Sequence, residues 1–194
     1  MGRSYTLKRR AESQAETRRR IVEAAVDLHS TLGPARTTVS MIAEKAGVQR
    51  NTFYAHFPDE RSMLMACSGH SLERDPLPDA QAWRAVGDPA DRLRVGLRAI
   101  YDWYERNESL VACVLRDAET HALVAEISAL RYGPAMAAWR EVLGEKLTDS
   151  QQPLLALALS FHTWRTMRRE STLEQASAVA LMVRAITEAQ GDDG

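Results

Sequence analysis

Apolar residues recur at every third or fourth position along most of this chain, which is the spacing of one face of an α-helix. The clearest stripe is formed by Leu93, Leu97, Ile100 and Tyr104. Asp88 is suited to cap the helix that carries this stripe, and Pro89 is suited to its first turn. No segment shows the alternation of apolar and polar positions, bounded by hairpin turns, that predicts strands. The pattern therefore predicts an all-α fold.

The same periodicity predicts further helices along the chain. They are expected at residues 21–28, within 38–57, from Arg61 onward, and at 111–117, 122–147, 154–164 and 172–189. A break near Asn107 is expected before the 111–117 helix, and Gly133-Pro134 is expected to kink the helix that contains it. Residues 75–89, which include three prolines, predict a loop. Two polar runs, Thr148–Ser150 and Ser171–Thr172, are expected to cap the helices that follow them.

Residues 38–57 have the pattern of two short helices joined at a glycine. Gly47 accepts the positive φ that a tight turn between nearly perpendicular helices requires. Ala43 is small enough to let the second helix approach, and the Thr38 hydroxyl can cap the first helix. The core of the pair is expected from Ile42, Val48 and Phe53. This arrangement is a helix-turn-helix.

From Thr38 to Phe57 the sequence resembles the TetR family of bacterial transcriptional regulators, whose DNA-binding domain carries the pattern Thr-Val-x-x-Ile-Ala-x-x-Ala-Gly-Val-x-x-x-Thr-Leu/Phe-Tyr-x-His-Phe. Looser similarity extends to the helices on either side. The resemblance implies a three-helix helix-turn-helix DNA-binding domain at residues 1–60 with a basic N-terminal arm. A helical ligand-sensing and dimerisation domain would follow at residues 61–194.

The free side of the second helix of the pair is expected to read bases. Arg50 is suited to a bidentate contact with guanine and Asn51 to one with adenine, whereas Thr52 offers a methyl or a hydroxyl group. The chain departs from the family pattern at Asn51, where Gly, Ala or Pro is frequent, and at Glu60, where a phosphate-facing Lys is frequent. Arg61 is placed to replace that phosphate contact.

Four neighbouring side chains are expected to hold the DNA backbone. Thr38 and Ser40 lie at the start of the first helix, where hydroxyl groups and free backbone amides can bind phosphates. Tyr54 and His56 are also expected on phosphates. The alternative for these two is half-buried packing beside Phe53 and Phe57.

The overall charge of −1 hides an asymmetry between the two ends of the chain. Residues 1–60 hold ten Lys and Arg against seven Asp and Glu, and residues 61–194 hold 15 against 19. Within residues 1–20 the basic side chains are Arg3, Lys8, Arg9, Arg10, Arg18, Arg19 and Arg20. Such an arm can follow phosphates or enter a minor groove. We expect phosphate contact from Arg18, Arg19 and Arg20, whereas residues 1–10 are equally compatible with a solvated tail.

Residues 154–164 are apolar nearly all round, so this helix must be buried on all sides. We expect it to pair with the helix at 172–189 and to form half of a four-helix homodimer interface, which is also where the family resemblance places the dimer contact. The alternative is a fully internal core helix. A dimer would let two recognition helices read a palindromic operator.

The resemblance also implies a small-molecule effector, apolar or amphipathic, that binds the helical domain and releases a repressor from its operator. The residues that fall where the family has its pocket are Trp103, His121, Met136 and Trp139. Aromatic residues at helical spacing are, however, usually ordinary core. Control by a protein partner, or no effector at all, is the alternative.

Other functional classes find little support in the sequence. The five histidines are scattered, and neither a phosphate-binding glycine loop nor a nucleophile elbow is present, which argues against an enzyme with an appended helix-turn-helix. Cys67 and Cys113 have no partners at metal-ligand spacing, so we expect no metal and no cofactor. No apolar run approaches the length of a membrane span, and no secretory signal is visible, so we expect a cytoplasmic protein without membrane contact.

Overall fold

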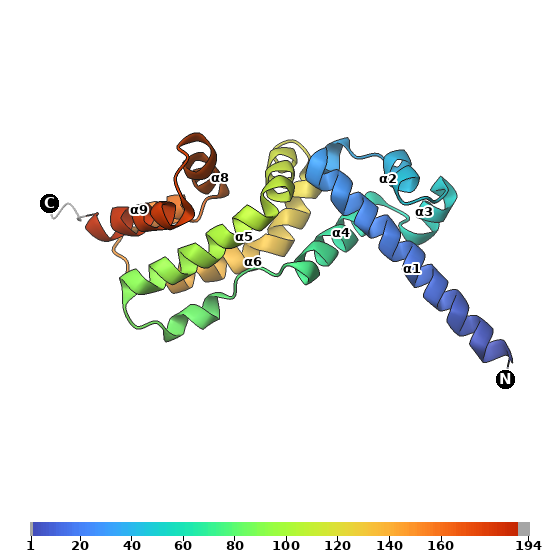
Figure 1. Cartoon of the computed structure of the whole chain (residues 1–194), viewed down its shortest axis with the longest axis horizontal. Coiled ribbons are helices and arrows are strands. Elements are labelled where there is room, and N and C mark those ends of the chain that lie inside the picture. The colour runs from blue at the N-terminus through green and yellow to red at the C-terminus, as the bar shows by residue number, and fades with distance from the viewer. Residues whose placement is uncertain (1, 190–194) are drawn as a thin grey trace. The chain divides into compact units, whose positions relative to one another are not determined.

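The computed structural model describes the backbone of residues 2–189 and the side chains of residues 8–189, and in that range it is helical without a strand (Figure 1). The all-α prediction is confirmed. Arg3 of the predicted arm lies outside the described side chains. The chain divides into two compact units.

The first unit contains the residues up to Pro76 together with Ser109–Arg131. Its elements are α1 (Gly2–Thr31), the 3₁₀ turn η1 (Pro34–Arg36), α2 (Val39–Lys45), α3 (Arg50–His56) and α4 (Glu60–Arg74), with the last part of α5 and the first part of α6. The arm is thus the beginning of a long helix. The division into compact units places α4 and residues 109–131 with the helix-turn-helix. A functional domain boundary after residue 60 remains a prediction.

Helices α1 to α4 share one hydrophobic core. Its fully buried members are Ile21, Ala25 and Phe57, and Ile42 and Phe53 are each 3% exposed. The half-buried Val48 packs against them, as the sequence predicted. Phe53 anchors α3 and Ile42 anchors α2, so each helix of the pair is held by its buried face.

The turn chemistry of the helix-turn-helix agrees with the sequence prediction. Gly47 has φ +64°, and the amide of Val48 donates to the carbonyl of Ala43 at 2.9 Å. The Thr38 hydroxyl accepts the Met41 amide at 3.3 Å, which caps α2. Asp59 caps α4 by accepting the Ser62 amide at 2.7 Å.

The connection between α1 and α2 is tied to the end of α5 (Pro89–Ala118). The buried Asp117 carboxylate accepts the Ala35 amide at 2.9 Å, and Arg116 donates to the carbonyl of Leu32 at 2.7 Å. Gly33 has φ +98°, and a Cβ there would lie 2.2 Å from the Arg116 guanidinium. Only glycine fits this close approach.

Helix α4 packs on the first part of α6 (Ala122–Gly144). Leu64 lies against Val124 and Ile127, and the ion pair Arg61–Glu126 has an N–O distance of 2.7 Å. Residues 122–131 therefore belong to the same body as the helix-turn-helix.

The second unit contains Leu77–Glu108 and the chain from Tyr132 onward. Its elements are η2 (Ala80–Ala85), the first part of α5, the second part of α6, α7 (Gln152–Ala158), α8 (Phe161–Arg165), a π-helical turn η3 (Thr166–Glu170) and α9 (Gln175–Glu188). Its core includes the fully buried Tyr101, Trp139, Trp164 and Ile186.

Several predicted boundaries in the later part of the chain are wrong. Helix α5 runs unbroken through Asn107, and residues 75–89 contain η2, with Trp83 buried. The run 154–164 is two helices, because the chain turns after Leu159, whose carbonyl accepts the Tyr104 hydroxyl at 2.7 Å. Ser160 then caps α8.

Two predicted capping runs are wrong as well. The N-cap of α7 is Gln151 and that of α9 is Glu174, and neither side chain makes a capping bond. The prediction at Asp88 and Pro89 is correct, since the Asp88 carboxylate accepts the Asp91 amide at 2.8 Å.

Candidate nucleic-acid interface

Helix α3 has one side that is buried in the core and one side that is exposed. Phe53 and Phe57 are buried, whereas Arg50 and Asn51, at the start of the helix, are exposed. Thr52 is half-buried. A short helix held by aromatic anchors thus presents a guanidinium and an amide to the outside. These are the groups that read the guanine and adenine edges in a major groove.

Tyr54 and His56 both pack beside the aromatic anchors of α3. The Tyr54 ring packs edge-on against Phe53, with ring centroids 5.6 Å apart, yet the residue is 45% exposed. His56 is half-buried, with its ring centroid 6.5 Å from that of Phe57. Packing fixes the orientation of both rings while Tyr54 keeps an open face.

The start of α2 presents two hydroxyl groups. Thr38 and Ser40 are both exposed. Since the Thr38 oxygen accepts the capping bond from Met41, its own O–H remains a donor for an outside acceptor. Hydroxyl groups so placed are suited to phosphate oxygens.

The three arginines at 18–20 of α1 have different surroundings. Arg19 forms ion pairs with Glu16 and Glu23, each with an N–O distance of 2.6 Å, and the hydrogen bond from Arg19 lowers the pKa of Glu16. The Arg18 guanidinium lies over the Phe57 ring, 4.8 Å from its centroid. A Cβ on Gly47 would lie 4.0 Å from Nη1 of Arg20, which places Arg20 beside the turn before α3.

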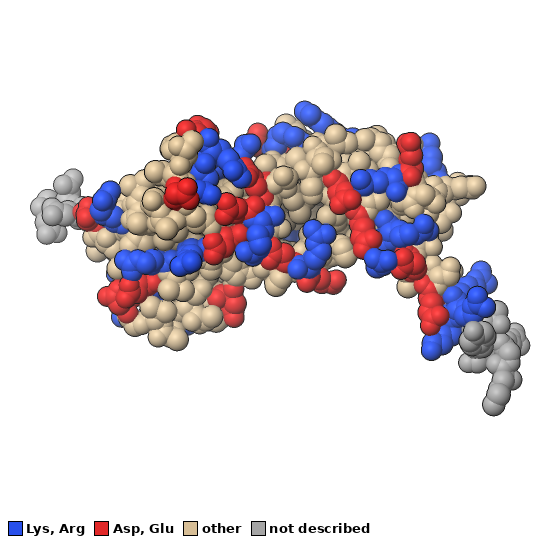
Figure 2. All heavy atoms as spheres, in the orientation of Figure 1, with Lys and Arg blue, Asp and Glu red and all other residues tan. Residues whose placement is uncertain are grey.

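The charge along α1 is mixed rather than uniformly positive. Figure 2 shows acidic and basic side chains alternating along this helix, with basic groups gathered toward its N-terminal end. The exposed basic residues described there are Lys8, Arg9 and Arg10. The excess of positive charge therefore lies toward the start of α1.

The four residues predicted to bind a ligand do not belong to one compact unit. Trp103 and Trp139 lie in the second unit and are 3% and 1% exposed, and the Trp139 indole donates to the carbonyl of Pro78 at 2.9 Å. Met136 is half-buried in the same unit. His121 lies in the first unit, with its Nε2 3.2 Å from the Glu60 carboxylate. Both tryptophans are packed core residues in this structure.

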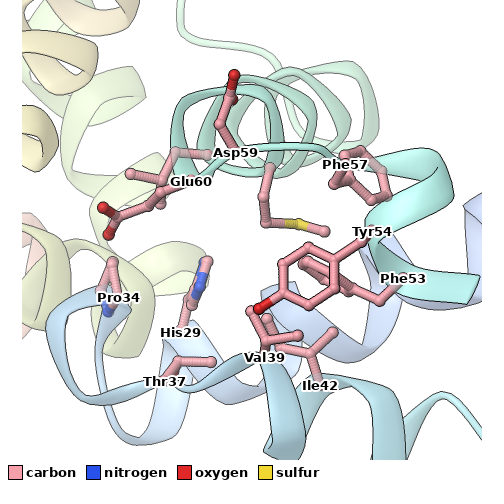
Figure 3. Close-up of a pocket in the computed structure, with 12 residues that line it drawn as sticks. His29, Pro34, Thr37, Val39, Ile42, Phe53, Tyr54, Phe57, Asp59 and Glu60 are labelled. Carbon is pink, nitrogen blue, oxygen red and sulfur yellow. The ribbon is translucent and has the colours of Figure 1, made fainter. Parts of the chain in front are cut away.

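A cavity of about 300 Å³ lies within the first unit, between the end of α1, η1, α2, α3 and the start of α4 (Figure 3). Its walls are mainly apolar and aromatic, and His29 and Glu60 are among its few polar groups. Burial lowers the pKa of His29 to about 4, although the nearby Asp117 carboxylate opposes this shift. No pattern in the sequence indicated this cavity, because its residues come from five separate elements and the short segments between them.

The described part of the chain offers little for metal or membrane chemistry. Within it, no group of three or more His, Cys, Asp or Glu side chains is placed to hold a metal ion. Cys67 and Cys113 are free and buried, and burial raises the pKa of the Cys67 thiol to about 12. No helix among these residues has the length and apolarity to cross a bilayer.

Comparison with known proteins gives a consistent result. Residues 21–67 match the model of the bacterial regulatory proteins of the tetR family. The transcriptional regulator SrpR of Pseudomonas putida is 38% identical over 82 residues, which cover 39% of this chain and 38% of SrpR. The transcriptional repressor KstR of Mycolicibacterium smegmatis is 29% identical over 106 residues, covering 55% of this chain and 52% of KstR.

The matched segments thus span about half the length of these relatives or less. The crystal structure of a TetR-like transcriptional regulator from Rhodococcus sp. RHA1 superposes with a TM-score of 0.65 at 19% identity, over 88% of this chain and 93% of that one. This likeness supports the fold. The range matched by the family model, residues 21–67, includes the exposed α3 residues.

Proposed function

Because the chain belongs to the TetR family of bacterial regulatory proteins, we propose that it is a DNA-binding transcriptional repressor. It acts as a homodimer that holds a palindromic operator and leaves it when a small apolar or amphipathic ligand binds the helical domain. The repressing sign follows the name of KstR, a similar protein. The family supports regulation and not catalysis.

The observation that carries this proposal is the exposed start of α3 on its buried aromatic support. Arg50 is assigned to guanine and Asn51 to adenine, and each good bidentate contact contributes about 1–3 kcal/mol of base discrimination. The half-buried Thr52 adds an apolar or hydrogen-bonding contact at the edge of this surface. Because Phe53 holds α3 in place, little ordering is needed on binding.

Backbone contacts surround the base-reading surface. Thr38, Ser40 and Tyr54 are exposed and carry hydroxyl groups, and His56 follows on the same helix as Tyr54. Arg18 and Arg19 were assigned to phosphates from the sequence. Arg19 would have to share its guanidinium with Glu16 and Glu23, so its contribution is smaller than that of a free cation.

The dimer contact is assigned to residues 154–164 and 172–189. Leu157 on α7 is 55% exposed, which argues against a fully internal position for this segment. On α9, Leu181 and Met182 are only half-buried. These apolar groups are available to a second subunit, and a two-fold dimer spaces recognition helices by about 34–36 Å on DNA.

Three of the four residues proposed to bind the effector lie in the second unit. Trp103, Met136 and Trp139 share one unit, but a ligand would have to displace well-packed tryptophans there. This packing favours a second candidate, a regulator controlled by a protein partner or without any effector. A change in operator affinity on adding metabolite extract would distinguish the two.

The proposal is tested by selecting binding sequences from random duplex DNA with the purified protein at fixed, near-physiological salt. We expect an enriched palindrome. Salt-sensitive binding without enrichment would show contacts to the DNA backbone alone, and the assignment of Arg50 and Asn51 to base reading would then be withdrawn.

A further inference from the structure

We propose that the cavity between α1, η1, α2, α3 and α4 is a second effector site, inside the DNA-binding unit, that takes a small aromatic amine. It differs from the proposed site in the helical domain in its position and in its direct contact with α3. Binding to the cavity is independent of the proposed function. Its consequence for DNA rests on that function.

The size and walls of the cavity fit one small ring system. Its volume of about 300 Å³ is at the lower end of the range of ligand pockets, about 300–1,000 Å³. Val39, Ile42 and Met63 supply apolar surface, and Phe53 and Tyr54 supply aromatic surface. An aromatic ligand of one or two fused rings would fill this space.

The charges at the cavity favour a cation. Asp59 and Glu60 are among the lining residues, whereas no Lys or Arg is among them. Asp59 is committed to capping Ser62, but Glu60 is 54% exposed and contacts His121 alone among the ion pairs described for it. A ligand ammonium can therefore approach Glu60, while a carboxylate in the same place would be repelled.

His29 adds a directional polar contact at the inner side. The residue is 5% exposed, and Figure 3 shows its ring directed into the same space as the Tyr54 hydroxyl. Because burial lowers its pKa to about 4, the imidazole is neutral at pH 7 and can accept or donate one hydrogen bond without repelling a cation.

An occupant would act directly on the DNA-reading helix. Phe53, Tyr54 and Phe57 belong to α3 or its end and form one side of the cavity. Tyr54 is also proposed to contact DNA, so a ligand that engages its hydroxyl group competes with that contact. We therefore expect the amine to weaken operator binding.

The binding test uses three indoles of similar shape and different charge: tryptamine, 3-propylindole and indole-3-propionate. Each is titrated into the full chain at pH 7 without DNA, and methyl NMR shifts are followed at Val39, Ile42 and Met63. We expect shifts at these methyl groups and an affinity order of amine, neutral compound, then carboxylate. Absence of shifts at these positions, or equal affinity for the carboxylate, would overturn the proposal.

Two variants locate the site. Glu60→Gln should reduce the preference for tryptamine over 3-propylindole by about threefold, the size expected for one solvated ion pair. Glu44→Gln, an exposed change on α2 outside the cavity, should leave the preference unchanged. Equal effects of the two changes would contradict the role of Glu60.

Val39→Phe fills part of the cavity and should lower the affinity for all three ligands by about tenfold or more. Circular dichroism checks that this variant is folded. If it does not fold, the Glu60→Gln comparison still decides the question.

The consequence for DNA is measured separately, with the selected operator. Tryptamine should lower operator affinity of the wild type and not that of Val39→Phe. Tryptamine binding without any change in operator affinity would overturn the regulatory part of the proposal. Failure to select an operator would count against the proposed function and leave the binding result standing.

Discussion

Aromatic side chains have different environments in the two units of this protein. In the helix-turn-helix, Phe53 is buried beneath Tyr54, which is 45% exposed on the surface proposed to meet DNA. In the described part of the second unit, Trp103 and Trp139 are both buried, and the large apolar residues that are exposed, Val95 and Leu157, are aliphatic. Aromatic residues at helical spacing therefore identify neither a surface nor a pocket by themselves. Their surroundings decide whether they stabilise or recognise.

The largest contrast is expected between Trp139→Ala and Tyr54→Ala. Trp139 is 1% exposed and its indole is hydrogen-bonded to Pro78, so its truncation should lower the free energy of unfolding by about 3–5 kcal/mol. Tyr54→Ala should cost less than about 1 kcal/mol, because half of the side chain is already in solvent. Urea unfolding at one fixed protein concentration measures both. A similar loss in the two variants would remove the distinction.

The second prediction concerns how the stability of the first unit depends on pH. Burial lowers the pKa of His29 from 6.5 to about 4, so the unfolded chain binds a proton at this residue before the folded chain does. Stability from this source is complete above about pH 6.5 and is lost as the pH falls toward about 4, by on the order of 3 kcal/mol.

The free energy of unfolding of wild type and of His29→Gln is measured from about pH 7.5 down to about pH 4, which covers the range between these two pKa values. The variant should show the shallower decline, although it is less stable than the wild type at pH 7.5. Parallel pH profiles would show that His29 does not carry the effect.

The exposed leucines allow a test of the dimer assignment. Leu157→Glu places a charge in the proposed interface and should raise the dimer dissociation constant by about tenfold or more. Leu130→Glu is the matched control, since Leu130 is 53% exposed but lies in the first unit. Sedimentation velocity over a concentration series reports both constants. If Leu130→Glu dissociates the dimer and Leu157→Glu does not, the interface has been placed on the wrong helices.

The smallest effect is expected among the arginines of α1. Removing a phosphate contact should reduce the salt slope of DNA binding by about one. We expect nearly this change for Arg20→Ala and a smaller one for Arg19→Ala, because Glu16 and Glu23 already neutralise Arg19. Binding to a random duplex at several salt concentrations separates the two. The reverse order would mean that Arg19 exchanges its acidic partners for phosphates on DNA.

The sequence predicted the helix-turn-helix well because its determinants are local. Gly47 needs only its own positive φ, and the Thr38 cap reaches three residues along the chain. The break after Leu159 was not predicted in this way, and the carbonyl at this break accepts a hydrogen bond from the Tyr104 hydroxyl, which is 55 residues away in sequence. The pattern of apolar residues continues through Leu159 and gives no sign of such a distant hydrogen bond.

The candidate site was likewise predictable only in part. Arg50 and Asn51 were found because they follow a recognisable turn, and they are exposed as expected. For Arg19 the sequence predicted a phosphate contact. The structure shows that Glu16 and Glu23, three and four residues away, form ion pairs with its guanidinium. Whether Trp139 is core or pocket depends on packing between distant segments.

The central claim is that Arg50 reads a base, and it is tested most directly by a double-mutant cycle between this side chain and the DNA. Wild type and Arg50→Ala are each bound to the selected operator and to operators changed at one guanine at a time, at constant salt. For one guanine, the wild type should lose about 1–3 kcal/mol on the base change while Arg50→Ala loses almost nothing. Equal losses for both proteins at every guanine would contradict the account.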